Sequence, residues 1–299
     1  MKVLVTGANG FVGRNIVPYL RKMGHVILTT DLDSGGARGD ITDKGFVLQT
    51  LMRHDFDSIV HLSAVADVRR CIEDAHRCYE VNSFGTLNLL ELAIRKRVRR
   101  FIYSSSANVY GVPLELPVHE TTPFNPRTPY DDSKVISENL IRSYGKLKGL
   151  RFVILRSWKL FGEYDIPTTA VSRFILACLR GNRIELYNGG KDTTDPYHIE
   201  NYCMAIQLCL EKDEAVGQAF NVGTGNEVSI RQLAELIKSL TKSGSEVVDL
   251  PPRSVAESQP MRSYPSIDKI RKTLGYKPMI GIEEGLRRTI RYHIDHPNS

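Results

Sequence analysis

The chain alternates short apolar runs with helical patterns, and this alternation limits the folds open to it. Apolar runs at residues 2–6, 25–30, 58–62, 100–104 and 151–155 are typical of buried strands. Helical periodicity lies between most of them; Leu87, Leu90 and Ile94, for example, share one face of a helix at 85–95. The pattern predicts a doubly wound α/β fold, in which a parallel sheet is covered by helices on both faces.

The pattern changes near Arg156. Beyond it we expect longer helices and fewer strands, with one helix starting at a capping box formed by Ser229 and Gln232. Residues 219–222 still form a core-like strand, so the second part is expected to be discontinuous. The sequence therefore predicts one domain over residues 1–155 with a returning strand at 219–222, and a smaller lobe over most of residues 156–299. Five prolines between Gly111 and Pro129 indicate a long irregular loop.

The net charge and the cysteines argue against several classes of function. The net charge of +6, from 40 basic and 34 acidic residues, suits a small anionic ligand and is too weak to indicate nucleic acid. The densest basic run, at residues 95–100, is expected to be a solvated helix end. Five cysteines without metal-ligand spacing predict reduced thiols, no metal and a cytoplasmic protein. No apolar run approaches the roughly 18 residues of a membrane span, so no membrane contact is expected.

Three glycines follow the first strand and open the next helix. Gly7, Gly10 and Gly13 would let the backbone approach a pyrophosphate, which the unpaired N–H groups of the helix can bind. Asp31 ends the second strand, where a carboxylate accepts hydrogen bonds from ribose hydroxyls and repels a 2′-phosphate. We therefore expect NAD rather than NADP, although Asp31 could also be a turn cap and Arg38 could favour NADP. Further cofactor contacts are expected from two short segments: Asp40 and Ile41 beside the adenine, and Leu62, Ser63 and Ala64 beside the pyrophosphate.

Tyr130 and Lys134 are candidate proton-transfer residues. Four residues apart on a helix, they lie on one face, where the ammonium is expected to lower the phenol pKa from its usual value of about 10. Such pairs are often inert helix-surface residues. Here Ser104 and Ser106 end the fifth strand, at the sheet edge where ligands bind, so a shared proton-transfer site is expected.

These motifs together resemble those of the extended short-chain dehydrogenase/reductases. The glycine turn, the segment YSSSANVYG (103–111) and Tyr130-x-x-x-Lys134 are similar to the NAD-dependent epimerase/dehydratase branch. Further similar segments are VNSFGTLNLLELA (81–93), LRSWKLFG (155–162), FNVGTG (220–225) and LGYKP (274–278).

The resemblance assigns roles to individual residues. It implies that Tyr130 is the catalytic base, that Lys134 binds the nicotinamide ribose and that Ser106 shares the proton. It implies cofactor contacts from Phe11, Val12, Asn82, Ser104 and Trp158, although a tryptophan at that position could equally be a core residue. It also implies a Rossmann fold and a homodimer formed by the helices around 85–95 and 130–146.

The reaction that the resemblance favours is 4-epimerisation of a nucleotide sugar. The 4,6-dehydratases of this family carry an acidic pair after the Ser/Thr, whereas this chain has Ala107 and Asn108. An NAD-dependent sugar dehydrogenase or 4-keto-sugar reductase with the same site is the alternative. A catalytically silent NAD sensor is a third hypothesis, which the complete Tyr, Lys and Ser set disfavours.

The chain departs from the family pattern at its phosphate anchors. Lys159 stands where the family has asparagine, Thr194 where it has arginine, and Arg253-Ser254-Val255 where it has Arg-Pro-Gly. Lys159 and Arg253 remain candidate substrate-binding residues, since lysine can serve a pyrophosphate as a point charge. His61 and His198 lack companions at metal-ligand spacing and are expected to be packed or surface residues.

Overall fold

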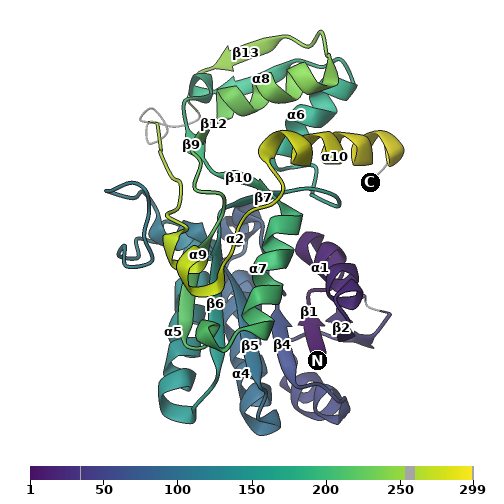
Figure 1. The fold of residues 1–299 in the computed structure, drawn as a ribbon, viewed down its shortest axis with the longest axis vertical. Helices are drawn as coiled ribbons and strands as arrows, with labels where there is room; N and C mark the ends of the chain where they lie inside the picture. Colours follow the sequence, from purple (N-terminus) through teal and green to yellow (C-terminus); the bar gives the residue numbers. More distant parts are fainter. Residues whose placement is uncertain (34, 253–259, 298–299) are drawn as a thin grey trace.

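The computed structural model describes residues 1–33, 35–252 and 260–297. Its centre is a seven-stranded sheet with the order β3-β2-β1-β4-β5-β6-β11, and every pair is parallel (Figure 1). The strands are β1 Lys2–Thr6, β2 Val26–Asp31, β3 Ala37–Arg38, β4 Ser58–His61, β5 Arg100–Ser106, β6 Phe152–Ser157 and β11 Gln218–Val222. The chain runs outward from β1 to β3 and then returns to β4 on the other side of β1. In such sheets ligands bind at the carboxyl ends beside this reversal.

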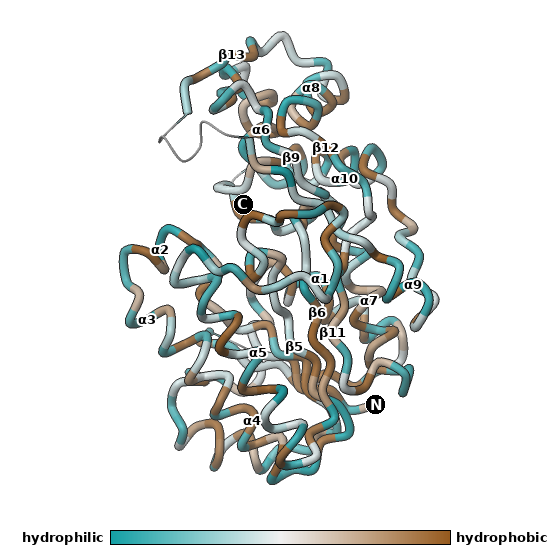
Figure 2. The backbone as a smooth tube through the Cα atoms, turned by 90° about the vertical axis from the view of Figure 1, so that its left-hand side faces the viewer, coloured by the Kyte–Doolittle hydropathy of each residue, from teal (hydrophilic) through white to brown (hydrophobic). Residues whose placement is uncertain are grey.

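Helices cover both faces of the sheet, as the alternation of patterns predicts. In Figure 2, α4 and α5 lie on one side of the central strands and α7 and α9 on the other, while the most hydrophobic segments gather in the strands between them. The helices of the two layers are α1 Phe11–Lys22, α2 Val68–Glu73, α3 Ala75–Tyr79, α4 Gly85–Lys96, α5 Pro129–Lys148, α7 Ile199–Glu211 and α9 Asp268–Leu274. The observed architecture is the predicted doubly wound Rossmann fold.

Local signals in the sequence explain where the key elements begin. In α5, Pro129 occupies the first turn and a capping box joins Thr128 to Asp131, so the helix starts one residue before Tyr130. The predicted capping box of Ser229 and Gln232 starts helix α8, Ile230–Thr241. Strand β11 pairs with β6, which returns the chain to the central sheet late in the sequence.

The second half of the chain contains more strands than expected. Three two-stranded sheets pair β7 Lys159–Phe161 with β10 Pro196–His198, β9 Thr193–Thr194 with β12 Val228–Ser229, and β8 Ile184–Tyr187 with β13 Val247–Leu250. The expectation of fewer strands is therefore wrong, because strands of two to four residues are too short to show a period in the sequence. Helices α6 Ala170–Leu179, α8 and α10 Ile282–Asp295 surround a separate apolar core.

The basic run at residues 95–100 also differs from its prediction. Helix α4 ends at Lys96, but Arg100 begins β5 and is fully buried. Its guanidinium donates to the carbonyls of Cys209 and Lys212 and to Asp213. A periodicity argument misses this residue because its burial depends on a helix that lies more than 100 residues away in the chain.

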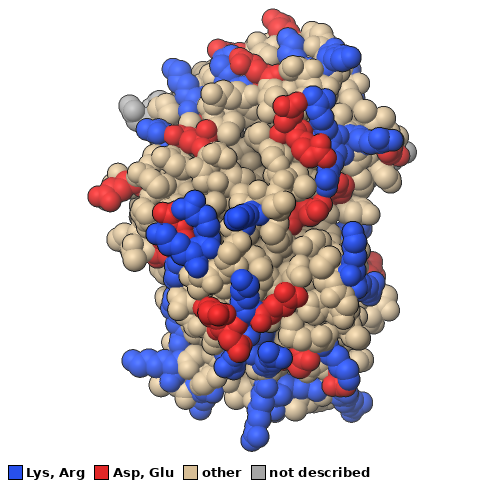
Figure 3. All heavy atoms as spheres, in the orientation of Figure 1, with Lys and Arg blue, Asp and Glu red and all other residues tan. Residues whose placement is uncertain are grey.

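Basic and acidic side chains are interspersed on the protein face shown in Figure 3. All five cysteines are free and buried. Of the helices that the structure describes, none has the length and apolarity to cross a membrane, and no group of three His, Cys, Asp or Glu side chains within the described ranges could hold a metal ion.

Candidate active site

One large cavity lies at the carboxyl ends of the central strands. Its volume is about 1260 Å³, and its wall continues into the loop at residues 165–169 and the start of β7. Most of the predicted site residues line it: Gly7, Gly10, Phe11, Val12, Gly13, Asp31, Asp40, Ile41, Leu62, Ser63, Ala64, Ser104, Ser106, Tyr130, Lys134, Trp158 and Lys159. Asn82 does not line it, and Arg253 lies outside the described residues.

The glycine turn forms a cradle that side chains would fill. Gly7 has a φ of +69°, and a Cβ there would lie 2.7 Å from the backbone nitrogen of Ser63. A Cβ on Gly13 would lie 2.2 Å from the carbonyl oxygen of Gly7. Helix α1 begins after Gly10 with no side-chain cap, so its first N–H groups are available to an anion. This bare helix start fits the pyrophosphate of a dinucleotide.

Asp31 lies beside this cradle at the end of β2. Its two carboxylate oxygens accept hydrogen bonds from the backbone nitrogens of Asn9 (2.9 Å) and Leu32 (2.7 Å). These bonds fix the carboxylate while leaving lone pairs for ribose hydroxyls. Arg38, the residue that could favour a 2′-phosphate, is engaged with the carbonyl of Leu32 (3.0 Å) and the carboxylate of Asp33 (3.4 Å).

The segment of Asp40 and Ile41 is held by α3 and α4. Arg77 donates to the Asp40 carboxylate at 2.8 Å, and Asn88 donates to the carbonyl of Ile41 at 3.0 Å. Burial, which raises the pKa of Asp40, is outweighed by hydrogen bonds from Arg77 and Thr42, so the pKa lies below its ordinary value. No pattern in the sequence pointed to Arg77, which lines the same cavity.

Asn82 lies outside the cavity and holds part of its wall in place through hydrogen bonds. It is fully buried; its amide oxygen accepts from the backbone nitrogen of Val65 (2.8 Å), and its amide nitrogen donates to the hydroxyl of Ser133 (2.9 Å). Val65 follows the cavity-lining residues Leu62, Ser63 and Ala64. Asn82 therefore connects this loop to α5.

His61 at the end of β4 is a buried residue, as expected. It forms hydrogen bonds with the hydroxyls of Thr6 and Thr86, and burial lowers its pKa to about 3.

Tyr130, Lys134 and Ser106 meet where β5 ends against α5. The Lys134 ammonium donates to the carbonyl oxygen of Ser104 at 2.9 Å and lies 5.8 Å from the centre of the Tyr130 ring. The same nitrogen is 4.9 Å from the centre of the Tyr103 ring, a cation–π contact. The Ser106 side chain lies close enough to the Tyr130 phenol to lower its pKa, against the larger effect of burial.

The pKa of Tyr130 differs from the expectation. Burial raises it to about 12 despite the opposing effect of the Ser106 side chain, and burial lowers the pKa of Lys134 to about 8. The expected lowering of the Tyr130 pKa is therefore wrong, because burial has the larger effect. The spacing of the two residues predicted their proximity but not their desolvation, which penalises both charged forms.

Trp158 and Lys159 follow β6 on the lobe side of the cavity. Trp158 is 5% exposed and lies against Tyr110, with 5.9 Å between ring centres, so it is both a core residue and a cavity residue. The Lys159 side chain is accessible within the cavity, where burial lowers the pKa of its amine and the charge of Asp131 opposes this effect. Thr194 lies in β9, and Asp195 beside it accepts from the backbone of Thr224 and Gly225.

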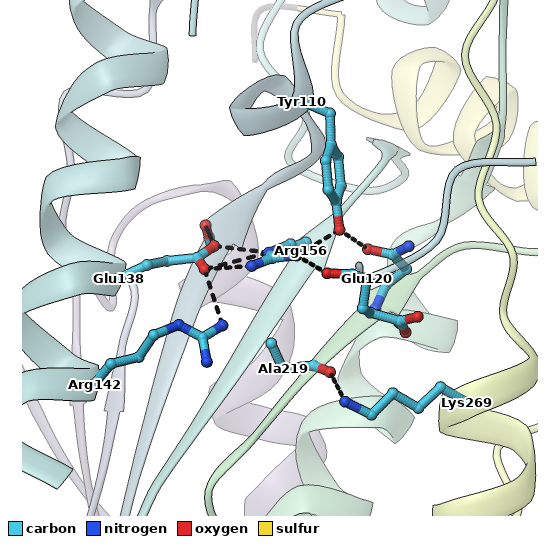
Figure 4. A network of polar contacts seen from close by, with 9 residues as sticks. Tyr110, Glu120, Glu138, Arg142, Arg156, Ala219 and Lys269 are labelled. Carbon is cyan, nitrogen blue, oxygen red and sulfur yellow. Dashed lines mark hydrogen bonds and ion pairs between the residues drawn. The ribbon is translucent and has the colours of Figure 1, made fainter. Parts of the chain in front are cut away.

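A buried polar network beside the site had no signal in the sequence. Figure 4 shows Arg156 of β6 between Glu138 of α5 and Tyr110. The guanidinium donates to the Glu138 carboxylate at 2.7 Å and to the Tyr110 hydroxyl at 2.6 Å. Its partners come from separate elements, so no local pattern could reveal them.

Known proteins share both this fold and these motifs. The model of the NAD dependent epimerase/dehydratase family matches residues 3–223. A putative UDP-glucose 4-epimerase of Methanocaldococcus jannaschii is 31% identical over 97% of each chain. UDP-glucuronic acid decarboxylase 1 of Xenopus tropicalis is 31% identical over 97% of this chain and 72% of its own. A dTDP-glucose 4,6-dehydratase of Streptomyces niveus is 30% identical over 99% of this chain and 93% of its own.

Solved structures agree over the whole chain. The UDP-glucose 4-epimerase of Thermotoga maritima with UDP-glucose superposes with a TM-score of 0.93 at 28% identity, covering 100% of both chains. The UDP-glucose 4-epimerase of Thermus thermophilus, in complex with NAD, gives 0.89 at 29% identity, covering 99% of this chain and 100% of the other. This chain belongs to the NAD-dependent epimerase/dehydratase family and is an NAD-dependent enzyme of the extended short-chain dehydrogenase/reductase class.

Proposed function

We propose that the protein is a nucleotide-sugar 4-epimerase that acts through transient oxidation at C4 to a 4-keto sugar. The observation that carries the proposal is the meeting of Tyr130, Lys134 and Ser106 in the same cavity as the dinucleotide cradle. A proton-transfer group beside a hydride-transfer cofactor suits alcohol–ketone interconversion. Relatives named epimerase and structural neighbours with NAD support this choice.

The residues of the cradle would hold the cofactor. The glycine turn with Phe11 and Val12 would receive the pyrophosphate, Asp31 the adenine ribose, and Asp40 with Ile41 the adenine. Leu62, Ser63 and Ala64 would lie beside the pyrophosphate, and the side chain of Lys134 would bind the nicotinamide ribose. NAD, when bound, supplies the hydride acceptor and donor and brings a positively charged nicotinamide ring.

Tyr130 would take the proton of the C4 hydroxyl. Ser106, whose side chain lies close to the phenol, would hold the reacting oxygen and share the proton. Because burial raises the pKa of the phenol to about 12, the base would form only when positive charge is close to it. Lys134 supplies part of that charge, since its pKa of about 8 leaves most of the amine protonated at pH 7.

The residues after Ser106 disfavour dehydration. Elimination of water from a neighbouring carbon needs an acid to protonate the leaving hydroxyl. Ala107 cannot supply one, and neither can the amide of Asn108, which lines the cavity. Oxidation and return of the hydride at C4 need no second acid, so 4-epimerisation suits these residues better.

Lys159 is our candidate anchor for an anionic group of the substrate. Its amine forms no ion pair with any described residue, although it lies in the wall of the same cavity as the glycine turn. Asp131, the nearest acid, uses one carboxylate oxygen on the backbone nitrogens of Arg127 and Thr128. Because the side chain is exposed in the wall of the cavity, its amine can reach an anionic ligand there. The diphosphate of a nucleotide sugar would supply that charge.

We propose that residues 1–155 with β11 form the cofactor domain and that most of residues 156–299 bind the substrate. Lys159 and the loop at 165–169 supply the lobe side of the cavity, in support of this division. We also propose a homodimer through α4 and α5, which lie side by side in Figure 2. Phe84 beside α4 is 62% exposed and Leu147 at the end of α5 is 74% exposed. Light scattering of the purified protein tests the dimer; a monomer at micromolar concentration contradicts it.

A panel of nucleotide hexoses tests the reaction. Each is incubated with purified enzyme, and the C4 epimers are quantified while absorbance at 340 nm is followed. The proposal predicts epimer interconversion without net NADH. Steady NADH formation in proportion to substrate would favour a sugar dehydrogenase instead. Tyr130→Phe should remove turnover by roughly 10²–10⁴-fold while leaving NAD binding in place.

A further inference from the structure

Three successive residues of β5 face three successive turns of α5. The carbonyl of Ser104 accepts from Lys134, the hydroxyl of Ser105 donates to Glu138 at 2.7 Å, and the side chain of Ser106 lies close enough to Tyr130 to lower the pKa of its phenol. Tyr130, Lys134 and Glu138 are spaced four residues apart, so they lie along one face of the helix. Only the bond between Ser105 and Glu138 contains no group that we place in proton transfer or cofactor binding.

Glu138 is also held by strand β6, which lies next to β5. Arg156 of β6 binds both of its carboxylate oxygens, at 3.0 Å through Nε and 2.7 Å through Nη2 (Figure 4). Glu138 is 0% and Arg156 2% exposed. Burial alone would lower the pKa of Arg156, but the hydrogen bonds and charge of Glu138 outweigh it and raise the pKa. Arg156 therefore keeps its charge and stays bound to the Glu138 carboxylate.

Arg156 is in turn fixed by neighbours from two further segments. Its guanidinium lies against the rings of Tyr110 and Phe124, 5.1 and 4.7 Å from their centres. Its Nη1 donates to the Tyr110 hydroxyl, which donates to Asn221 of β11 at 2.7 Å. The guanidinium thus joins α5 to the carboxyl ends of β6 and β11. Through its bond with Ser105, Glu138 also connects this network to β5.

We propose that Ser105, Glu138 and Arg156 form a positioning unit for the reaction, which sets the distance between Ser106 and Tyr130. Without the Ser105 bond, α5 could shift along β5 while the fold and the cofactor cradle remain. Because Ser106 and Tyr130 share one proton, a small shift would change the rate of proton transfer more than substrate binding. These three residues are positioning residues: Ser105 lines the cavity, but its hydroxyl donates to Glu138, and we assign none of the three a contact with substrate or cofactor.

Ser105→Ala is the direct test, because it removes one hydroxyl and leaves the buried ion pair intact. We expect kcat to fall by about tenfold to a hundredfold, the cost of a misplacement near 1 Å. KM and the Kd for NAD should stay within about twofold of wild type, as expected when ground-state binding is untouched. Ser105→Thr, which keeps the hydroxyl, should recover most of the loss.

A second variant and a matched control make the test specific. Glu138→Gln should lower kcat similarly, and the double variant with Ser105→Ala should be no slower than the slower single variant, since both act through one bond. Ser58→Ala removes a fully buried serine hydroxyl at the far end of the adjacent strand β4 and should leave kcat unchanged. Thermal melts establish that each variant is folded.

The outcomes separate this inference from the proposed function, whose assignment of Ser106 and Tyr130 it rests on. A folded Ser105→Ala enzyme with kcat within twofold of wild type overturns the positioning unit. Equal losses in kcat, substrate binding and NAD binding also overturn it, because they indicate general loosening. Retained activity in Tyr130→Phe defeats the proposed function instead.

Discussion

Replacing Lys134 by methionine should remove activity and also relieve a stability cost that depends on pH. Lys134 is 4% exposed, and burial lowers its pKa from 10.5 to about 8. Below pH 8 the folded protein must keep a desolvated ammonium that the unfolded chain holds in water. Methionine has a similar length and no charge, so the variant avoids this cost.

The pKa values give the size of the effect. A difference of about 2.5 pKa units corresponds to about 3 kcal/mol of unfolding free energy, present in full below pH 8. As pH rises from 8 towards 10.5, the folded protein releases the proton first, so the unfolded state binds more protons and wild-type stability increases. From pH 7 to pH 9.5, the ionisation of Lys134 therefore raises the unfolding free energy of the wild type by about 2 kcal/mol, whereas the variant has no such ionisation.

Urea unfolding of both proteins at pH 7 and pH 9.5 measures the effect. We expect the stability of Lys134→Met relative to wild type to fall by about 2 kcal/mol between the two pH values. The charged and the neutral amine bond differently to Ser104, but this difference is already contained in the folded-state pKa of about 8 and needs no separate correction. Lys146→Met, which removes an exposed amine of the same helix, should show no such change. A relative stability that is the same at both pH values would refute the assigned burial of the ammonium.

Other predictions concern the cofactor and substrate contacts. Asp31→Ala should weaken NAD binding and raise the affinity for NADP relative to NAD; unchanged titrations would make Asp31 only a turn residue. Gly13→Ala places a Cβ 2.2 Å from a backbone oxygen and should weaken NAD binding at least about tenfold, whereas Gly244→Ala, with open space around it, should not. Lys159→Met should raise KM for a nucleotide sugar about tenfold or more without changing NAD binding, because it removes one charge-assisted contact with the substrate. An unchanged KM would show that Lys159 is not part of the substrate site. Bound NADH should quench the emission of Trp158, the single tryptophan, and gain sensitised fluorescence; unquenched emission would place Trp158 away from the nicotinamide.

The parts of the fold and site that the sequence predicted are those encoded locally. The turn with Gly7 and Gly13 requires glycine because backbone atoms occupy the space of a Cβ. The helix of Tyr130 and Lys134 starts at a proline and a capping box that lie next to each other in the chain. Such features depend on a few neighbouring residues, so their pattern survives in a single sequence.

The features that the sequence missed depend on distant partners. Arg156 and Glu138 look like surface residues until β6 and α5 are packed together. Arg100 is buried by carbonyls of a helix that ends at Glu211 and by the turn after it. The raised pKa of Tyr130 likewise reflects burial by several elements at once, whereas spacing shows only its neighbour Lys134. Prediction from one sequence therefore found the groups that we propose react, but not the buried residues that pack around them.

The most direct test of the proposed reaction follows the hydrogen on C4. A nucleotide hexose labelled with deuterium at C4 is incubated with the enzyme, and both C4 epimers are recovered and examined by NMR. The proposed mechanism predicts that the opposite epimer appears with deuterium still at C4 and that no reduced cofactor accumulates. Product that has lost the label from C4, or a labelled substrate that is oxidised with lasting NADH formation, would contradict the 4-epimerase assignment.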